Sequence, residues 1–140
     1  MKHLRSQLMG KIRGKNTKLE QSVSKALWKN GYRFRKNVLS LYGKPDIAIK
    51  KYKVVIFIDS CFWHGCKSHY KLPSKNPDYW TKKISRNIER DLEVTQYYVN
   101  NEWVLIRVWE HDLKANFVSI IDQICKTVMM AKQQSVQKRL

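Results

Sequence analysis

Residues 53–66 read Lys-Val-Val-Ile-Phe-Ile-Asp-Ser-Cys-Phe-Trp-His-Gly-Cys, and the predicted fold is organised around this segment. Its first part, residues 54–58, is apolar at every position. A strand with one wet face alternates apolar and polar side chains, so this run predicts a central strand covered on both faces. The second part is rich in side chains that can act chemically, namely Asp59, Cys61, Phe62, Trp63, His64 and Cys66. An exposed pair of large rings is costly unless something covers it, so we interpret the end of this strand as the active site.

Hydrophobic periodicity places the other elements around this strand. It predicts helices over residues 17–30, 78–101 and 116–130, and strands over residues 32–38, 46–49 and 103–109. The apolar face of the second helix is expected at Ile84, Ile88, Leu92, Thr95 and Val99. This order of elements predicts an α/β fold with a mixed sheet flanked by helices.

The first helix begins at a capping box, with Thr17 as N-cap and Glu20 bonding back to it. Glu20 is therefore explained either as a cap alone or as a functional acid. Asp91, in the second helix, lies at the edge of the expected buried face, which is an unusual place for an acid.

A length of 140 residues fits one domain with a core of its own. We expect a basic arm at residues 1–16, the folded domain at residues 17–131 and a polar tail at residues 132–140. The sequence has no run of about 18 apolar residues, and its first residues are not followed by an apolar segment. Neither a membrane span nor a secretory signal is predicted, and the expected location is the cytoplasm.

The charge balance is strongly basic, with 28 Lys and Arg against 11 Asp and Glu and a formal net charge of +17. Such an excess is usually neutralised by a polyanion, so it favours nucleic acid as the partner. A solvated basic surface, as in ribosomal or membrane-surface proteins, is the alternative that charge alone leaves open. The three cysteines of a cytosolic chain favour metal ligation or reduced thiols over disulfides.

Two carboxylates are expected to meet at the end of the central strand. Asp46 begins a short strand after Pro45, and Asp59 ends the hairpin partner of that strand. Carboxylates on neighbouring strands can share a Mg²⁺ ion, which binds one or two of them together with water and phosphate oxygens. The alternative is that Asp46 is only a turn residue after proline.

A second group of side chains has the composition of a zinc site. Tetrahedral Zn²⁺ is usually bound by four thiolate or imidazole ligands, and the candidates here are Cys61, Cys66, His69 and His111. Buried thiols with two surface histidines are the alternative. His64 stands between the two cysteines, so it is a candidate both for zinc ligation and for the general base that activates water.

Five sequence motifs occur in order along the chain: Met-Gly-Lys-Ile-Arg-Gly-Lys-Asn-Thr at 9–17, Gly-Lys-Pro-Asp at 43–46, Cys-Phe-Trp-His-Gly-Cys at 61–66, Arg-Asn-Ile-Glu-Arg-Asp at 86–91 and Val-Trp-Glu at 108–110. Together they resemble the very short patch repair DNA mismatch endonucleases. The resemblance implies a restriction-endonuclease-like fold, a catalytic Mg²⁺ and a structural Zn²⁺. It also implies that the enzyme nicks double-stranded DNA 5′ to the thymine of a T·G mispair left by deamination of 5-methylcytosine.

The resemblance assigns roles to single residues. It makes Asp46 the metal-binding catalytic aspartate and His64 the histidine that helps to activate water, with Glu20 and Asp91 as supporting acids. The residues inserted into the duplex beside the mispair would be Met9, Phe62 and Trp63. Contacts to the DNA backbone are expected from Lys11, Arg13, Lys15, Lys82 and Arg86. We expect a monomer associated with the nucleoid, with mismatch-repair proteins as candidate partners.

Three positions depart from the family pattern. His111 stands where some relatives have cysteine, and Asp59 replaces a histidine found in some of them. Cys61 replaces the lysine of the wider restriction-enzyme pattern, which agrees with His64 taking over its role.

The sequence is also consistent with two alternative functions. One is a restriction or structure-selective endonuclease on the same scaffold. The other is a zinc-stabilised DNA-binding module without catalysis, which would leave Asp46, Asp59 and His64 without a role.

Overall fold

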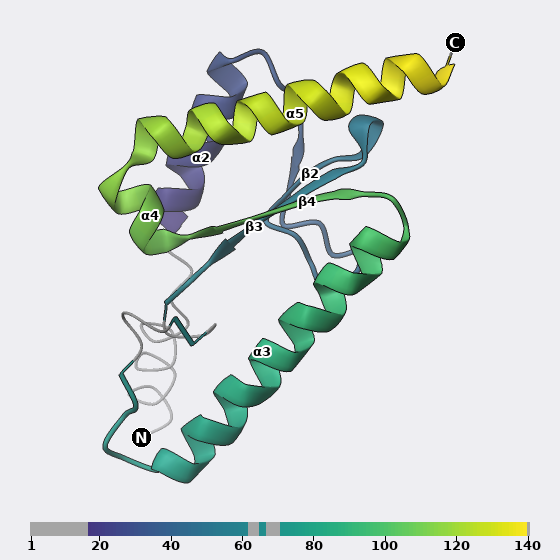
Figure 1. Cartoon of the computed structure of the whole chain (residues 1–140). Coiled ribbons are helices and arrows are strands. Elements are labelled where there is room, and N and C mark those ends of the chain that lie inside the picture. The colour runs from purple at the N-terminus through teal and green to yellow at the C-terminus, as the bar shows by residue number, and fades with distance from the viewer. Residues whose placement is uncertain (1–16, 62–64, 67–70, 140) are drawn as a thin grey trace.

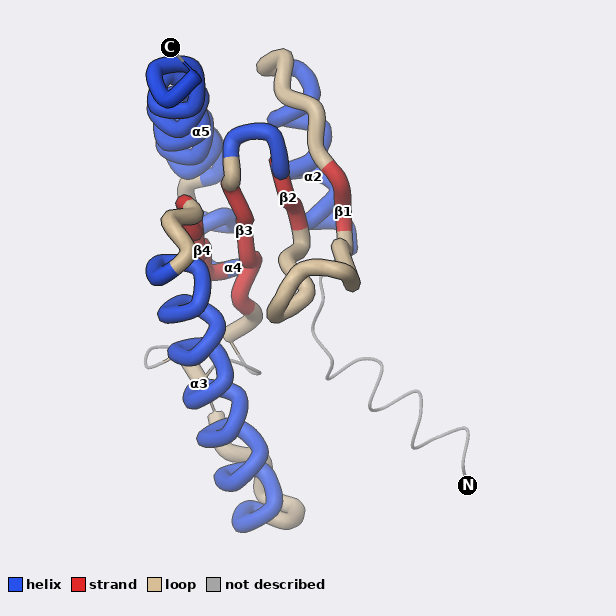
Figure 2. The backbone as a smooth tube through the Cα atoms, turned by 90° about the vertical axis from the view of Figure 1, so that its right-hand side faces the viewer, coloured by secondary structure: helices blue, strands red, loops and turns tan. Residues whose placement is uncertain are grey.

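The computed structural model of the chain describes residues 17–61, 65–66 and 71–139. These residues form a four-stranded mixed sheet with helices on both faces, as the sequence predicts (Figure 1). The strands follow the order β1-β2-β3-β4, so β1 and β4 are the edges of the sheet (Figure 2). Their bounds are β1 (Arg35–Lys36), β2 (Ile47–Ile49), β3 (Val54–Asp59) and β4 (Val104–Trp109).

Helices α2 and α5 cover one face of the sheet, and α3 lies on the other (Figure 1). The helical elements are α2 (Thr17–Lys29), η1 (Lys50–Tyr52), α3 (Pro77–Asn100), α4 (Glu110–Ala115) and α5 (Phe117–Arg139). In the part of the chain described above, no helix is both long and apolar enough to cross a membrane.

Strand β3 is the centre of the fold, and the prediction that both its faces are covered is confirmed. Val54 and Ile56 pack in the core beneath α2 and α5, whereas Val55 and Phe57 pack in a second core with α3. β3 pairs antiparallel with β2 and parallel with β4. The alternation expected for β4 is also confirmed, because its residues divide between the same two cores.

The strand predicted over residues 32–38 is wrong in extent, because only Arg35 and Lys36 pair with β2. Tyr32 is buried in the core between α2 and α5, where its hydroxyl donates to the carbonyl oxygen of Cys125 at 3.4 Å. Phe34 packs against that same core. The alternating rings therefore reflect packing onto helices rather than a ladder of strand hydrogen bonds.

The buried face of α3 differs from the predicted one. Ile84 is buried as expected, but Leu92 is 67% exposed and Val99 is 58% exposed. The helix instead buries Val94 and Tyr98, and the Tyr98 hydroxyl donates to the carbonyl oxygen of Tyr42 at 2.5 Å. The large ring of Tyr98 occupies the core against Phe57, which rotates the buried stripe away from Leu92 and Val99.

The C-terminal part is more helical than predicted. A short additional helix, α4, follows β4 directly, and α5 continues through the residues expected to form a polar tail. Residues 131–139 contain no Pro or Gly to end a helix, and Ala131 is still buried against the core.

Candidate active site

The site forms where β3 and β4 end side by side. The parallel register places Asp59 opposite Trp109, so the segments that leave the two strands start at the same edge of the sheet. One segment carries Cys61 and Cys66, and the other, the first turn of α4, carries Glu110 and His111. Residues about fifty positions apart are thereby brought into contact.

Cys61, Cys66 and His111 form a compact group of potential metal ligands, with donor atoms all within 4.8 Å of one another. His111 Nδ1 lies 3.2 Å from Cys61 Sγ and 3.6 Å from Cys66 Sγ. In a tetrahedral zinc site with Zn–S of about 2.3 Å and Zn–N of about 2.0–2.1 Å, sulfur and nitrogen ligands are roughly 3.6 Å apart. The donor set and its spacing therefore fit such an ion, and three of the four predicted ligands lie together. His69, the fourth, lies outside the described residues.

Hydrogen bonds from both segments fix these ligands. The backbone N–H of Cys61 donates to Glu110 Oε1 at 2.9 Å, and the N–H of Cys66 donates to the carbonyl oxygen of Cys61 at 2.9 Å. On the far side of the imidazole, His111 Nε2 lies 3.3 Å from Asp112 Oδ1. A carboxylate on the second ring nitrogen orients a ligating histidine, and here it would direct Nδ1 toward an ion bound between the two thiols.

Glu110 and Asp112 were not predicted as site residues. The available signal was the run Glu110-His111-Asp112 directly after a strand, next to a candidate ligand. His111 is the one described histidine, and its side chain is half-buried.

Burial, and next the neighbouring Cys66, raise the pKa of the Cys61 thiol from its ordinary value of 9.0 to about 11. Without a metal ion this thiol is therefore protonated at neutral pH. Metal binding must displace its proton, because the thiolate is the ligand form.

Asp46 lies immediately before β2 and is 7% exposed. Its Oδ2 atom accepts a hydrogen bond from the backbone N–H of Ile58 at 2.7 Å, which holds the carboxylate against the end of β3. A residue that only turned the chain after Pro45 would be expected at the surface, so burial and this bond favour a site role.

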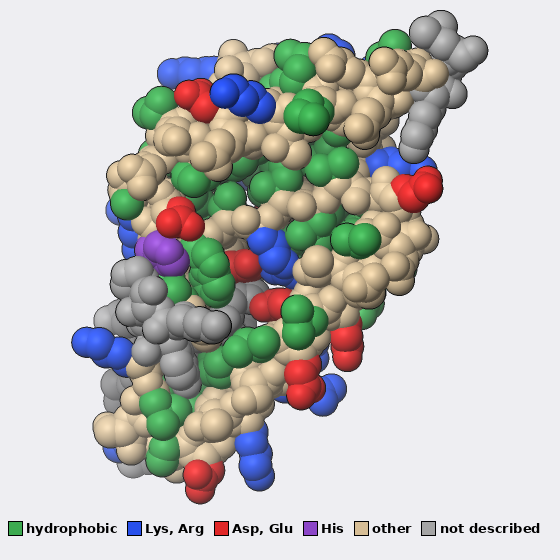
Figure 3. All heavy atoms as spheres, viewed as in Figure 1, with side chains coloured by type: hydrophobic (Ala, Val, Ile, Leu, Met, Phe, Trp, Pro, Cys, Tyr) green, Lys and Arg blue, Asp and Glu red, His purple; other side chains and the backbone are tan. Residues whose placement is uncertain are grey.

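Asp59 is also buried, at 5% exposure, but its carboxylate is paired with an arginine. Arg107 Nη1 lies 2.9 Å from Asp59 Oδ1, and Arg107 Nη2 lies 3.8 Å from Asp91 Oδ1. Alternation along the strands places Asp46, Asp59 and Arg107 on the face of the sheet that α3 covers. Figure 3 shows acidic and basic side chains gathered between α3 and the sheet.

The loop between the two cysteines is anchored at Gly65. Its φ of +61° is in the left-handed region, and an added Cβ would lie 2.9 Å from Ile88 Cδ1 and 3.0 Å from Ile84 Cγ2. Gly65 thus packs directly on α3. Glycine suits this position because it tolerates both the positive φ and the close approach.

The structure places the remaining predicted residues as follows. Glu20 is half-buried in the first turn of α2, and Lys82 and Arg86 are exposed on α3. The cap at Thr17 stays a prediction, since the side chain of Thr17 is not described. The others lie outside the described residues: Met9, Lys11, Arg13, Lys15, Phe62, Trp63 and His64.

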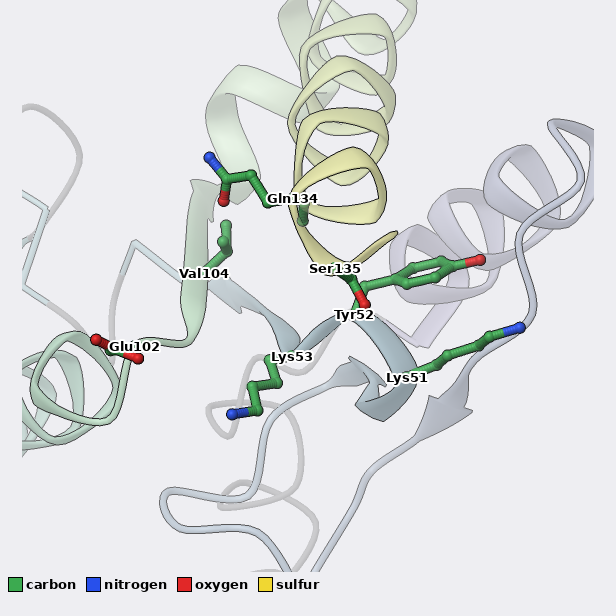
Figure 4. Close-up of a pocket in the computed structure, with 8 residues that line it drawn as sticks. Lys51, Tyr52, Lys53, Glu102, Val104, Gln134 and Ser135 are labelled. Atoms are coloured by element: carbon green, nitrogen blue, oxygen red, sulfur yellow. The ribbon is translucent and has the colours of Figure 1, made fainter. Parts of the chain in front are cut away.

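A cleft of about 290 Å³ lies at the opposite end of the sheet, where β3 and β4 begin. It is lined by Lys51, Tyr52 and Lys53 from the turn at η1, by Glu102 and Val104, and by Gln134 and Ser135 near the end of α5 (Figure 4). None of the predicted site residues lines it.

Comparison with known proteins shows the family to which the chain is similar. The family model of the DNA mismatch endonuclease Vsr matches residues 1–71. The type II nicking enzyme V.NaeI of Lentzea aerocolonigenes is 42% identical over 126 residues, which cover 86% of this chain and 76% of the relative. The type II nicking enzyme V.NmeDIP of Neisseria meningitidis serogroup C is 40% identical over 126 residues, or 89% of this chain and 85% of the relative.

The DNA mismatch endonuclease Vsr of Escherichia coli K12 is 33% identical over 114 residues, which cover 81% of this chain and 73% of the relative. Two of these relatives are nicking enzymes, and the third is a DNA mismatch endonuclease. The chain accordingly belongs to the Vsr family of DNA endonucleases and is an endodeoxyribonuclease.

Proposed function

We propose that this endonuclease depends on Mg²⁺ and nicks one DNA strand 5′ to the thymine of a T·G mispair, the first step in short-patch repair of deaminated 5-methylcytosine. The family match and the similarity to the Escherichia coli relative, a DNA mismatch endonuclease, support this substrate. The proposal includes a restriction-endonuclease-like arrangement of the mixed sheet, and action as a monomer in the cytoplasm at the nucleoid.

The position of Asp46 is the main observation that supports Mg²⁺-dependent cleavage. Its carboxylate is buried at the edge of the sheet where β3 and β4 end, and one oxygen is fixed by the N–H of Ile58. A carboxylate held in this way is preorganised to bind a divalent cation without a further loss of side-chain freedom. Bound Mg²⁺ would polarise the scissile phosphate and stabilise the charge that develops on it.

His64 is proposed as the base that accepts a proton from the attacking water. The described residues that flank its segment are held in place, because Cys61 bonds to Glu110 and Gly65 packs on α3. Glu20 and Asp91 are proposed to support the centre, and Asp91 is already linked to it through Arg107.

The group of Cys61, Cys66 and His111 is proposed to bind a structural Zn²⁺, with His69 as the fourth ligand. Its distances support this ion, and Asp112 supplies the carboxylate that zinc-bound imidazoles usually contact. Such an ion would join the segment after β3 to α4 and so set the position of residues 62–65.

Binding of duplex DNA is proposed to rest on the net charge of +17. The exposed Lys82 and Arg86 on α3 and the basic arm, through Lys11, Arg13 and Lys15, would contact the phosphates. Met9, Phe62 and Trp63 are proposed to insert beside the mispair, where weaker stacking lowers the cost of opening the step.

The test is a cleavage assay on end-labelled duplexes that carry a T·G mispair between randomised flanking pairs, beside the same pool with T·A. We expect a Mg²⁺-dependent nick in the thymine strand of T·G duplexes, mapped to the bond 5′ to the thymine and abolished by EDTA. Equal cutting of both pools would exclude mismatch selection and favour the structure-selective or restriction alternative. DNA binding without cutting in any Mg²⁺ concentration would favour the non-catalytic module.

A further inference from the structure

Arg107 makes several polar contacts at the candidate site. Its Nη1 donates to Asp59 Oδ1 at 2.9 Å, its Nε to Thr95 Oγ1 at 3.1 Å and its Nη2 to the carbonyl oxygen of Asp91 at 3.3 Å. The guanidinium also lies 4.6 Å from the centre of the Phe57 ring. These contacts join β3, β4 and α3, and only 19% of the arginine side chain is exposed.

These bonds leave Arg107 poorly suited to bind a DNA phosphate. All three of its nitrogens already donate to protein oxygens, and the planar group is fixed over a ring. Its role must therefore be exerted on the residues that it contacts, above all on the buried carboxylate of Asp59.

The positive charge of Arg107 should affect how tightly the nearby carboxylates bind a divalent metal ion. Asp46 and Asp59 lie on one face of the sheet at the ends of neighbouring strands, as two carboxylates that share a divalent ion would. The guanidinium of Arg107, 2.9 Å from Asp59, competes for an oxygen of that carboxylate and repels a cation bound nearby, since like charges repel more strongly in a partly buried site than in bulk water.

We infer that Arg107 is a positioning residue whose positive charge has two effects at this site. It holds the carboxylate of Asp59 in place, and it lowers the affinity of the Asp46 site for a divalent metal ion in the absence of DNA. The inference rests on the proposed metal site at Asp46. The DNA phosphate would then supply the additional oxygen ligands that make metal binding favourable, so that metal and substrate bind together.

The test is an equilibrium titration of the zinc-loaded protein with Mn²⁺ in the absence of DNA, in which the free ion is measured by electron paramagnetic resonance. R107M should bind Mn²⁺ at least about tenfold more tightly than the wild type, because one nearby positive charge is lost. R107K keeps the charge and should stay within about threefold of the wild type. R33M is the matched control, since Arg33 is exposed and stacks on Trp28 near the start of β1, at the other end of the sheet.

If Arg107 only stabilised the fold, R107M would melt at a lower temperature than the wild type and would bind Mn²⁺ no more tightly. That result would overturn the inference. If R107M does not fold, the double variant R107M/D59N decides, because it removes both members of the buried pair and leaves no unpaired charge. The double variant should bind Mn²⁺ at least about tenfold more tightly than D59N, which keeps the arginine charge without its partner. Equal affinity of these two variants would show that Arg107 does not affect the metal site and would overturn the inference. Failure of the proposed metal site is distinguishable, because then D46N would bind Mn²⁺ as the wild type does.

Discussion

The Nδ1 atom of His111 lies 3.2 Å from the Sγ atom of Cys61, although the two residues are 50 positions apart in the chain. The contact exists because β3 and β4 are parallel and end at the same level, at Asp59 and Trp109. A metal ion held there would connect the segment after β3 to the helix after β4, and would stabilise both against local unfolding.

Replacing Cys61 by serine should therefore destabilise the protein and lower its zinc content. The purified wild type should contain about one zinc per chain, and C61S should contain much less and melt on the order of 10 °C lower. Metal analysis and thermal unfolding measure the two quantities. C125S is the matched control, because Cys125 packs at the edge of the α5 core and is not part of the group. Equal behaviour of C61S and C125S would contradict a structural metal at Cys61.

Zinc affinity should rise steeply with pH. Burial and Cys66 raise the pKa of Cys61 to about 11, so at neutral pH the metal must displace the thiol proton. We expect release of about two protons per zinc, one from each cysteine, and weaker binding at pH 6 than at pH 8. Chelator competition at several pH values, with proton release measured in weak buffer, provides the check. Affinity independent of pH would mean that the thiolates are already formed.

The same raised pKa has a second consequence for the metal-free protein. Because the folded state favours the protonated thiol, its contribution to stability is full below the ordinary thiol pKa of 9.0 and is lost as the pH rises toward 11. Metal-free protein should thus lose stability in this alkaline window, and C61S, which lacks the thiol, should lose less.

The sequence predicts those parts of the fold in which one physical signal dominates. Residues 54–58 are apolar at every position and form a strand buried on both faces, and the alternation in β4 matches its two cores. The prediction fails where packing overrides the pattern. Tyr32 and Phe34 alternate like strand residues but pack on helices, and Tyr98 turns α3 away from the face that Leu92 and Val99 suggest.

The sequence also predicts only some of the residues at the candidate site. Cys61, Cys66 and His111 were identified by residue type, because few other roles suit two thiols and an imidazole near a strand end. Arg107 and Asp112 were missed as site residues. Their meaning depends on the parallel register of β3 and β4 and on the first turn of α4, and neither can be read from residue types alone.

Replacing Asp46 by asparagine should abolish nicking and leave DNA binding nearly intact. The amide keeps the size of the side chain and an oxygen for the Ile58 N–H, but it loses the charge that binds a divalent cation. We expect a loss of at least about 10³-fold in nicking rate, with the Kd for duplex DNA within about threefold of the wild type. D122N serves as control, because Asp122 is exposed on α5. A nicking rate close to the wild type for D46N would remove Asp46 from the mechanism.

Duplex binding should weaken steeply with salt. Each phosphate neutralised by Lys or Arg contributes a slope of about −0.9 in log K against log salt, and the chain carries a net charge of +17. Removal of residues 1–16 should make this slope shallower, and the variant K82Q/R86Q on α3 should do so independently. Fluorescence anisotropy over a range of salt concentrations measures both slopes. An unchanged slope in the truncated protein would show that the arm makes no phosphate contact.

Gly65 provides a test of the loop that carries the proposed base. G65A would keep a φ of +61°, which costs a residue with a Cβ roughly 1–2 kcal/mol, and would also place the new methyl group 3.0 Å from Ile84 Cγ2. Ile84 is 4% exposed and has little room to move, whereas Ile88 is 39% exposed and can turn aside. The loop should therefore shift away from α3 and displace His64 and Cys66. We expect a loss of nicking rate of about tenfold to a hundredfold, because small misplacements of catalytic groups are costly.

G31A separates backbone strain from displacement of the loop. Gly31 has a φ of +87° after the end of α2, and a Cβ there would meet nothing within 4 Å. G31A should lose stability through backbone strain alone and keep its nicking rate, as measured by thermal unfolding and by single-turnover cleavage of T·G duplex. G65A should have both a lower melting temperature and a lower nicking rate than G31A. The two variants should differ more in nicking rate than in melting temperature. If G65A and G31A fall equally in melting temperature and nick at equal rates, the packing of Gly65 on α3 does not position the catalytic loop.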